Sequence, residues 1–242
     1  MFKIHKSFYL FILIAVLSGA FINSLIIFTL IIIHELGHFI FAKKMNVEVD
    51  KIYIYPLGGI SKFNLELNTK PIIEFIILIM GPIFQFLAYK ILIIVLPNYH
   101  EIIAEYHFQI LMFNLLPIYP LDGGKLLNII LSLKLPYKKS LYFSTLISYI
   151  TIFLIIVSRK QIKLNIIIMV VLLLYKVGKE KRKIILLYEK FLLERTFKNY
   201  KFNKLKIINN RNDFYKNHRH IIKENDKYYY ENDFLLKKIK KN

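Results

Sequence analysis

The sequence predicts an all-α polytopic membrane protein with about six transmembrane helices, a small β-hairpin at the membrane surface and a short basic α/β tail. Hydrophobic residues make up 56% of its 242 residues, whereas soluble domains contain about 45–50%. Charge is unevenly spread, because residues 176–242 hold 20 of the 35 Lys and Arg but only 8 of the 16 acidic residues. We therefore expect a transmembrane domain over residues 1–178 and a basic cytoplasmic tail over residues 179–242.

The first two apolar segments, at about 7–22 and 23–42, predict a tight helical hairpin, because only Asn23 and Ser24 separate them. The first segment follows a short basic start, as the apolar part of a signal peptide does. It lacks a clear small-x-small cleavage site, and a second apolar run follows at once. We therefore expect it to be retained as the first span.

The hydrophobic pattern changes over residues 46–68. The run VEVDKIYIY alternates apolar and polar residues, PLGG interrupts it, and ISKFNLEL alternates again. A period of two residues is typical of strands. This stretch predicts a β-hairpin that lies at the membrane surface.

Four more apolar segments follow, at about 71–96, 104–133, 140–158 and 162–177. Gly81-Pro82 lies inside the first of these and should kink or break its helix and let neighbouring chain approach closely. The next segment is interrupted by PIYPLDGG. Because non-helical backbone at membrane depth is tolerated only where it is buried in protein or lines a wet cavity, the interruption indicates a functional site.

The loop charges predict that both termini lie in the cytoplasm, because Lys43, Lys44 and most other loop lysines fall on one side of six spans. The basic loop at 159–163 does not fit this orientation. We expect the tail to lie against anionic lipid of the bilayer. Nucleic acid is not an expected partner, because the tail contains no helix-turn-helix, zinc-finger or aromatic RNA motif.

An H-E-x-x-H motif lies in the second segment, at residues 34–38. His34 and His38 are four residues apart, so on a helix both imidazoles lie on one face and can bind one metal ion. Glu35 can face the same metal, where a general base takes a proton from metal-bound water. The alternative is a pair of core histidines satisfied by backbone carbonyls. Ionisable groups at membrane depth are costly unless they are paired or bind an ion, which favours the metal site.

Asp122, within NLLPIYPLDGG at residues 114–124, is the candidate third ligand. Taken alone, an Asp before Gly-Gly is typical of a turn. A catalytic zinc, however, usually takes three protein ligands and one water molecule, so a two-histidine site requires a further ligand. The chain contains no cysteine, so any zinc must be held by nitrogen and oxygen atoms.

These motifs resemble those of the site-2 protease family of intramembrane zinc metalloproteases, whose members pair HExxH on one membrane helix with an Asp in an N-P-D-G-like motif on another. Within that family the chain is most similar to the sporulation proteases that process the precursor of a mother-cell sigma factor. The resemblance runs through nearly the whole chain, in HELGH at 34–38, PLGG at 56–59, GPIFQ at 81–85, NLLPIYPLDGGKLL at 114–127 and FLLERTF at 191–197.

The resemblance implies one zinc ion per chain, bound by His34, His38 and Asp122, with Glu35 as the catalytic base and Asn114 in a supporting role. It implies a membrane-associated protein substrate, which we expect to be the pro-sequence of a sporulation sigma factor, and it allows for inhibitory membrane partners. The protein would then lie in the bacterial cell membrane or in the membrane around the forespore.

The tail departs from this resemblance. Members of the sporulation group often end in a nucleotide-binding CBS module, but only about 45 residues follow FLLERTF. We expect at most a partial module of this kind, with two short strands and a helix in HRHIIKENDKYYYENDFLLKKIKK.

Two other functions stay open. A site-2 protease that cleaves a membrane-held anti-sigma factor would be favoured by an inserted PDZ domain, for which no loop is long enough. A non-enzymatic zinc transporter or scaffold would repeat His and Asp sites along several spans. Here the expected ligands form one cluster, with a glutamate that transport does not need.

Overall fold

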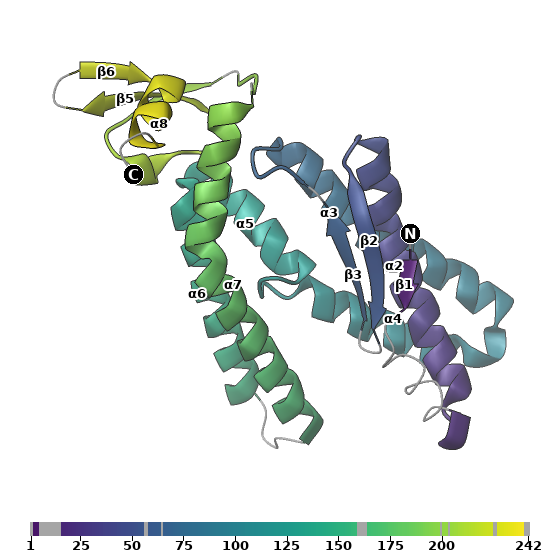
Figure 1. Cartoon of the computed structure of the whole chain (residues 1–242). Coiled ribbons are helices and arrows are strands. Elements are labelled where there is room, and N and C mark those ends of the chain that lie inside the picture. The colour runs from purple at the N-terminus through teal and green to yellow at the C-terminus, as the bar shows by residue number, and fades with distance from the viewer. Residues whose placement is uncertain are drawn as a thin grey trace. The chain divides into compact units, whose positions relative to one another are not determined.

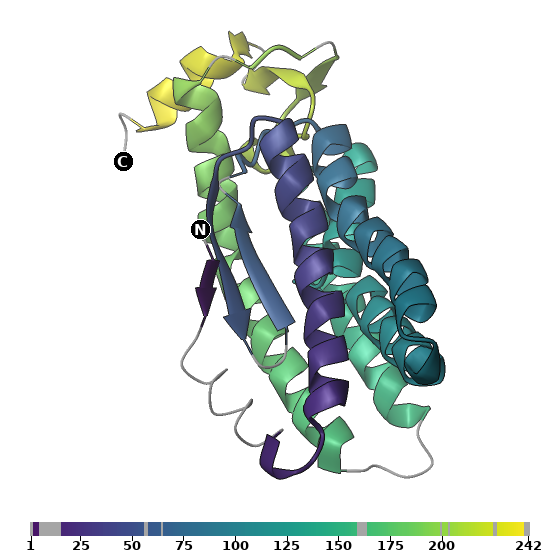
Figure 2. The same ribbon diagram turned by 90° about the vertical axis from the view of Figure 1, so that its right-hand side faces the viewer.

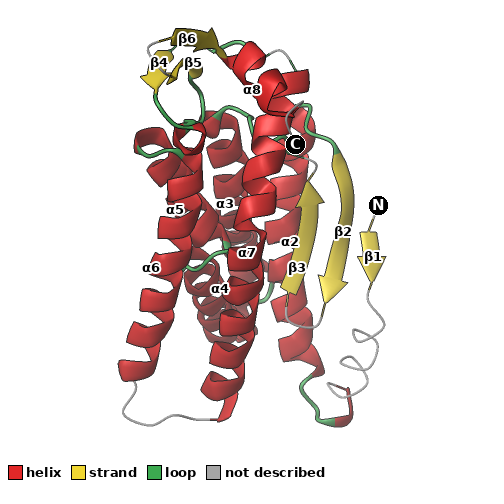
Figure 3. Ribbon diagram, turned by 60° about the vertical axis from the view of Figure 1, so that its left-hand side comes forward, coloured by secondary structure: helices red, strands yellow, loops and turns green. Residues whose placement is uncertain are grey.

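The computed structural model describes residues 2–4, 16–55, 58–63, 65–158, 164–198, 200–202, 204–224 and 227–239. The chain forms two compact units, which are described separately. Unit 1 comprises Met1–Leu65 and Phe75–Asn114, and unit 2 comprises Glu66–Glu74 and Leu115–Asn242. Each unit contains helices and one three-stranded sheet (Figure 3).

Three helices form the body of unit 1. They are α2 (Phe21–Lys44), most of α3 (Pro71–Val95) and α4 (His100–Leu115), with a short 3-10 helix, η1 (Pro97–Tyr99), before α4. These helices run side by side (Figure 2). Their buried core consists of Ile26, Leu30, Ala88 and Ile103, which come from all three helices.

The hairpin predicted over residues 46–68 is present as β2 (Val49–Tyr55) and β3 (Gly58–Phe63), which pair antiparallel. A short strand, β1 (Phe2–Ile4), pairs parallel with β2, so the strand order is β1-β2-β3. β2 and β3 lie beside α2 (Figures 1 and 2). In the strand order β1-β2-β3, β3 is an edge strand.

Unit 2 contains α5 (Asp122–Lys134), α6 (Tyr137–Val157) and α7 (Leu164–Phe197). Serines spaced four residues apart on α6, namely Ser140, Ser144 and Ser148, are fully buried. Their small side chains let α5 and the preceding backbone approach: Asn128 Nδ2 donates a hydrogen bond to Ser144 Oγ at 3.1 Å, and Tyr119 N–H donates to Ser148 Oγ at 2.8 Å. This polar face of α6 holds the start of α5.

The C-terminal module consists of β4 (Leu205–Ile208), the 3-10 helix η2 (Arg211–Asp213), β5 (Arg219–Glu224), β6 (Lys227–Tyr230) and α8 (Glu231–Ile239). β5 is central, parallel to β4 and antiparallel to β6. The predicted two strands and helix are confirmed, and β4 adds a third strand. Ile222 and Phe234 of this module share a buried core with Tyr188 and Phe191 of α7. α7 itself runs through the domain boundary predicted at 178/179.

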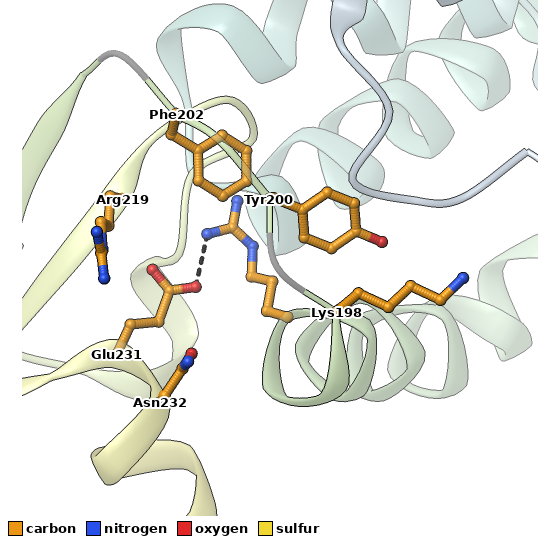
Figure 4. Close-up of a pocket in the computed structure, with 7 residues that line it drawn as sticks. Lys198, Tyr200, Phe202, Arg219, Glu231 and Asn232 are labelled. Atoms are coloured by element: carbon orange, nitrogen blue, oxygen red, sulfur yellow. Dashed lines mark hydrogen bonds and ion pairs between the residues drawn. The ribbon is translucent and has the colours of Figure 1, made fainter.

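Arg195, near the end of α7, is the centre of a buried polar network. Its ion-pair partner Glu231 lines a pocket together with Tyr200 and Phe202 (Figure 4). Arg195 forms the ion pair with Glu231 at 2.8 Å and donates a hydrogen bond from Nε to Asn68 Oδ1 at 2.6 Å. Asn68 in turn donates to Glu194 Oε2 at 3.2 Å. Because a buried charge is stable only when it is paired and hydrogen-bonded, this network ties the C-terminal module to α7 and to residues 66–74.

Among the described residues, three helices are long and apolar enough to cross a membrane: α2, α3 and α6. The predicted helical membrane architecture is supported, but the count of six spans is not confirmed. α4 and α5, with 16 and 13 residues, are shorter than the roughly 20 that a span needs. The first segment, at about 7–22, and the basic loop at 159–163 lie largely or wholly outside the described residues.

The interruption predicted in the fourth segment is present, because residues 116–121 between α4 and α5 are not helical. α3, in contrast, is not broken at Gly81-Pro82. Proline inside a membrane helix is tolerated where neighbouring groups satisfy the freed backbone carbonyl.

Candidate metal centre

His34 and His38 lie on one face of α2, as their spacing predicts. Both side chains are buried, with exposed fractions of 2% and 3%. Their Nε2 atoms lie 3.1 Å apart, and their rings meet edge to face with centroids 4.8 Å apart. The helix therefore brings two imidazole nitrogens together at one point.

Groups on α3 hold the other nitrogen of each ring. His38 Nδ1 lies 2.8 Å from the carbonyl oxygen of Ile77, and His34 Nδ1 lies 3.0 Å from Oε1 of Gln85. Carbonyl and amide oxygens only accept hydrogen bonds, so Nδ1 carries the proton in both rings. Each Nε2 then keeps its lone pair, which is the form in which histidine binds a metal.

This donor set fits zinc. Two nitrogen lone pairs that face each other at 3.1 Å repel unless a cation or a shared proton lies between them. Tetrahedral zinc binds histidine nitrogens at about 2.0–2.1 Å, which places two such nitrogens about 3.3 Å apart. The spacing of the histidine pair is therefore close to that of two ligands on one zinc ion.

Glycines let α2 and α3 pack closely at the motif. A methyl group at Gly81 would overlap the imidazole ring of His38, and one at Gly37 would overlap the backbone of Met80. The close approach predicted at Gly81-Pro82 is thus confirmed, and the group that comes close is a candidate ligand.

Glu35 is half-buried on α2, directly after His34. Consecutive residues on a helix point about 100° apart. The Glu35 side chain therefore leaves α2 to one side of the histidine face. This placement fits a base that acts on a bound water molecule and does not itself hold the metal.

Asp122 belongs to unit 2, where it is the first residue of α5 and is buried with an exposed fraction of 8%. A methyl group at Gly123 or Gly124 would overlap the backbone of residues 115–119, so this stretch folds tightly against the start of α5. Lys125 Nζ lies 3.4 Å from Asp122 Oδ1. The helix N-terminus also favours a carboxylate at this position.

The predicted site residues thus fall on both units. His34 and His38 are brought together within unit 1, and Asp122 is fixed by unit 2; all three are buried and each can offer one ligand atom. Asn114 lies in the last turn of α4 and is half-buried.

Sequence reasoning missed Gln85 and the carbonyl of Ile77 as partners of the histidines. A backbone carbonyl leaves no signal in a sequence. Gln85 does leave one, because a lone amide within the apolar residues of α3 needs a buried hydrogen-bond partner. The sequence does not indicate that this partner is His34, because the two residues are 51 positions apart.

Comparison with known proteins places these features in context. Residues 22–101 match the model of peptidase family M50. The chain is 31% identical to stage IV sporulation protein FB of Bacillus subtilis, over 84% of this chain and 75% of that protein. It is 30% identical to zinc metalloprotease MJ0392 of Methanocaldococcus jannaschii, over 74% of this chain and 56% of that protein.

A solved structure shows the same fold. A site-2 protease from Methanocaldococcus jannaschii superposes with a TM-score of 0.57 and 24% sequence identity, covering 74% of this chain and 89% of that one.

Proposed function

The chain belongs to peptidase family M50, the site-2 proteases, and on this premise we propose that it cleaves a membrane-associated protein at a zinc site formed by His34, His38 and Asp122, with Glu35 as general base. It is a zinc metalloprotease, and zinc is its cofactor. The observation that carries the choice of residues is the buried histidine pair, with Nε2 atoms 3.1 Å apart and both Nδ1 atoms bonded to α3.

Asp122 completes the ligand set in this proposal. Two histidines leave zinc short of the three protein ligands that catalytic sites usually provide. Asp122 is a buried carboxylate, and the two glycines after it pack tightly against the backbone of residues 115–119, which suits a ligand. When bound, zinc supplies a Lewis acid that lowers the pKa of its water to about 7 and polarises the scissile carbonyl. Asn114, eight residues before Asp122, supports the site without binding the metal.

Glu35 moves the proton in the reaction. Its carboxylate accepts a proton from the attacking water and passes it to the nitrogen of the leaving amine as the C–N bond breaks. The imidazoles of His34 and His38 keep their Nδ1 protons throughout, because the Gln85 amide and the Ile77 carbonyl hold them.

The substrate must be extended at the cleaved bond, because a helical peptide hides its carbonyl groups in its own hydrogen bonds. Strand addition to the hairpin of unit 1 meets this need, since β3 is an edge strand and an extended segment can pair with such an edge. The part of α3 around Gly81-Pro82, which packs against the His38 ring, is a second guiding surface in the proposal.

We further propose that the substrate is the pro-sequence of a sporulation sigma factor, because one relative at 31% identity is a sporulation protein. The protein would then lie in the membrane around the forespore, with both termini in the cytoplasm and inhibitory membrane partners that delay cleavage. A membrane-held anti-sigma factor is the competing substrate.

Co-expression tests this choice of substrate. Membrane-associated sigma-factor precursors and membrane-held anti-sigma factors would each be produced with the protein, and with its Glu35→Gln variant as the inactive control. We expect a shortened sigma factor only with the parent protein. A shortened anti-sigma factor and an intact sigma-factor precursor would assign the protein to another pathway.

A further inference from the structure

Gln85 is a fully buried amide in the otherwise apolar middle of α3, and it contacts a candidate zinc ligand. We propose that Gln85 is a positioning residue that fixes the orientation and the tautomer of His34. This inference rests on the proposed function, in which His34 binds zinc. Gln85 would bind no substrate and no metal, and would act only through the ring of His34.

The orientation of the Gln85 amide follows from its second partner. Gln85 Nε2 lies 3.0 Å from the backbone carbonyl oxygen of His107. Because that oxygen only accepts hydrogen bonds, the NH₂ group must face it, and Oε1 must face His34. The atom of His34 that Oε1 meets, at 3.0 Å, is Nδ1. The carbonyl of His107 therefore dictates, through Gln85, that His34 is protonated on Nδ1 and presents the lone pair of Nε2.

The support for Gln85 is itself rigid. His107 is buried, and its ring stacks on Tyr89 with centroids 4.4 Å apart and planes 9° apart. Its Nδ1 lies 3.3 Å from Gln85 Nε2, so the amide has a second hydrogen-bonding neighbour. A chain of contacts thus runs from α4 through α3 to His34 on α2.

The two histidines differ in how they are held. A backbone carbonyl, which no substitution can remove, holds His38, whereas a side chain holds His34. Without Gln85, the ring of His34 could rotate or change tautomer, and Nε2 would no longer be fixed toward His38. Loss of such a supporting hydrogen bond typically costs about 10–100-fold in metal affinity or activity.

Three variants test this role. Gln85→Leu removes both polar ends of the side chain, and Gln85→Glu keeps an oxygen acceptor toward His34. Gln109→Leu is the matched control, because Gln109 is an exposed amide on α4 that bonds only to Glu105 among the described residues. Zinc affinity would be measured on each full-length protein in detergent by competition with a chelator of known affinity.

We expect zinc affinity to fall about 10–100-fold in Gln85→Leu, to recover at least partly in Gln85→Glu and to stay unchanged in Gln109→Leu. An unchanged affinity in Gln85→Leu, or an equal loss in Gln85→Glu and Gln85→Leu, would overturn the proposal. The thermal unfolding midpoint would also be measured on each zinc-free protein. A lower midpoint in Gln85→Leu than in the parent would identify a folding defect.

A spectroscopic readout keeps the proposal testable even if Gln85→Leu is less stable. NMR of protein labelled with ¹⁵N in its histidine rings distinguishes the two tautomers, and His34→Ala identifies the signals of His34. We expect the Nδ1-protonated form of His34 in the parent protein and in Gln85→Glu. The Nε2-protonated form in the parent would overturn the proposal.

His34→Ala also separates this inference from the proposed function. If His34→Ala binds zinc as the parent does, His34 is not a ligand and the proposed metal site fails. If His34→Ala loses zinc while Gln85→Leu keeps it, the metal site stands and only the role of Gln85 fails.

Discussion

The backbone N–H of Tyr215 donates a hydrogen bond to Nε2 of His220 at 3.0 Å. This bond makes Nε2 an acceptor, so the proton of the buried His220 ring is on Nδ1, 3.3 Å from Glu231 Oε2. Protonating Nε2 would place two N–H groups against each other. The ring that links β5 to the start of α8 is therefore neutral in the folded C-terminal module.

The first prediction is that acid destabilises the C-terminal module. Burial lowers the pKa of His220, so between its folded pKa and the unfolded value of about 6.5 the unfolded chain binds more protons. The contribution of His220 to the free energy of unfolding of the module is therefore fully present above about pH 6.5. It is lost as the pH falls, by up to about 1.4 kcal/mol per pH unit, until the His220 ring of the folded protein titrates. Burial acts to raise the pKa of Glu231, but the His220 hydrogen bond and the Arg195 charge hold it below its usual range, which adds a loss at lower pH.

Hydrogen exchange of residues 205–230, corrected for the intrinsic effect of pH, would measure this change between pH 7.5 and pH 5.5. We expect protection to fall in the parent protein. His100→Gln is the control, because it removes an exposed histidine outside the C-terminal module, and it should show the same fall in protection. Equal protection at both pH values would contradict a neutral, buried His220.

The second prediction concerns Gly81. Gly81→Ala places a methyl group within the His38 ring, so the ring must move and zinc binding should fall by at least about 10-fold. Gly178→Ala is the matched control: among the described residues its methyl group would meet only Tyr149 Oη, at 3.8 Å, and alanine stabilises a helix interior by up to about 1 kcal/mol over glycine. Zinc content and thermal midpoint would be measured together. Parent-like zinc binding in Gly81→Ala would show that the helices can move apart at this point.

The third prediction concerns the exposed lysines directly before the C-terminal module. We expect them to bind anionic lipid or to hold a substrate near the membrane. The double change Lys201→Gln with Lys204→Gln should therefore raise KM a few-fold and leave kcat unchanged. Lys179→Gln with Arg182→Gln removes the same charge from α7 and serves as the control. These changes test the role more cleanly than deletion of residues 200–242, because deletion would expose Arg195 and Phe191. An unchanged KM would leave the lysines with a role in membrane topology alone.

The fourth prediction is that Asp122→Ala loses zinc and cleavage together, since a two-histidine site binds zinc more weakly than a three-ligand site. Asp213→Ala is the comparison, because it removes a partly exposed carboxylate from an ion pair with Lys139. Zinc content after dialysis and cleavage of a membrane substrate would be measured on both. Full zinc content in Asp122→Ala would remove Asp122 from the ligand set.

Much of the fold could be predicted because its signals are local. The four-residue spacing of His34 and His38 places them on one helix face, and the period-two pattern of residues 46–68 predicts the hairpin. The run PIYPLDGG around Asp122 predicts that the helix is interrupted there. Each of these signals lies within one short stretch of the sequence.

Other features depend on residues that meet only after folding. Lys216 counts toward the charge excess of a solvated tail in the sequence, yet its Nζ is buried and lies 2.5 Å from Glu74 Oε1. Arg195 and Glu231 form a buried pair across 36 residues, and His34 and Gln85 meet across 51. The count of six spans is not confirmed, because apolar character alone does not fix where each helix begins and ends: α4 has 16 residues and α5 has 13.

Replacing Glu35 by glutamine shows whether this residue performs chemistry at a zinc site. Glu35→Gln keeps the size of the side chain and leaves the histidine pair intact but removes the proton acceptor. We expect the purified variant to bind zinc like the parent, to unfold at the same temperature and to cleave substrate about 10²–10⁴-fold more slowly, with uncleaved substrate remaining bound. Cleavage by zinc-loaded Glu35→Gln at the rate of the parent protein would show that Glu35 is not the general base.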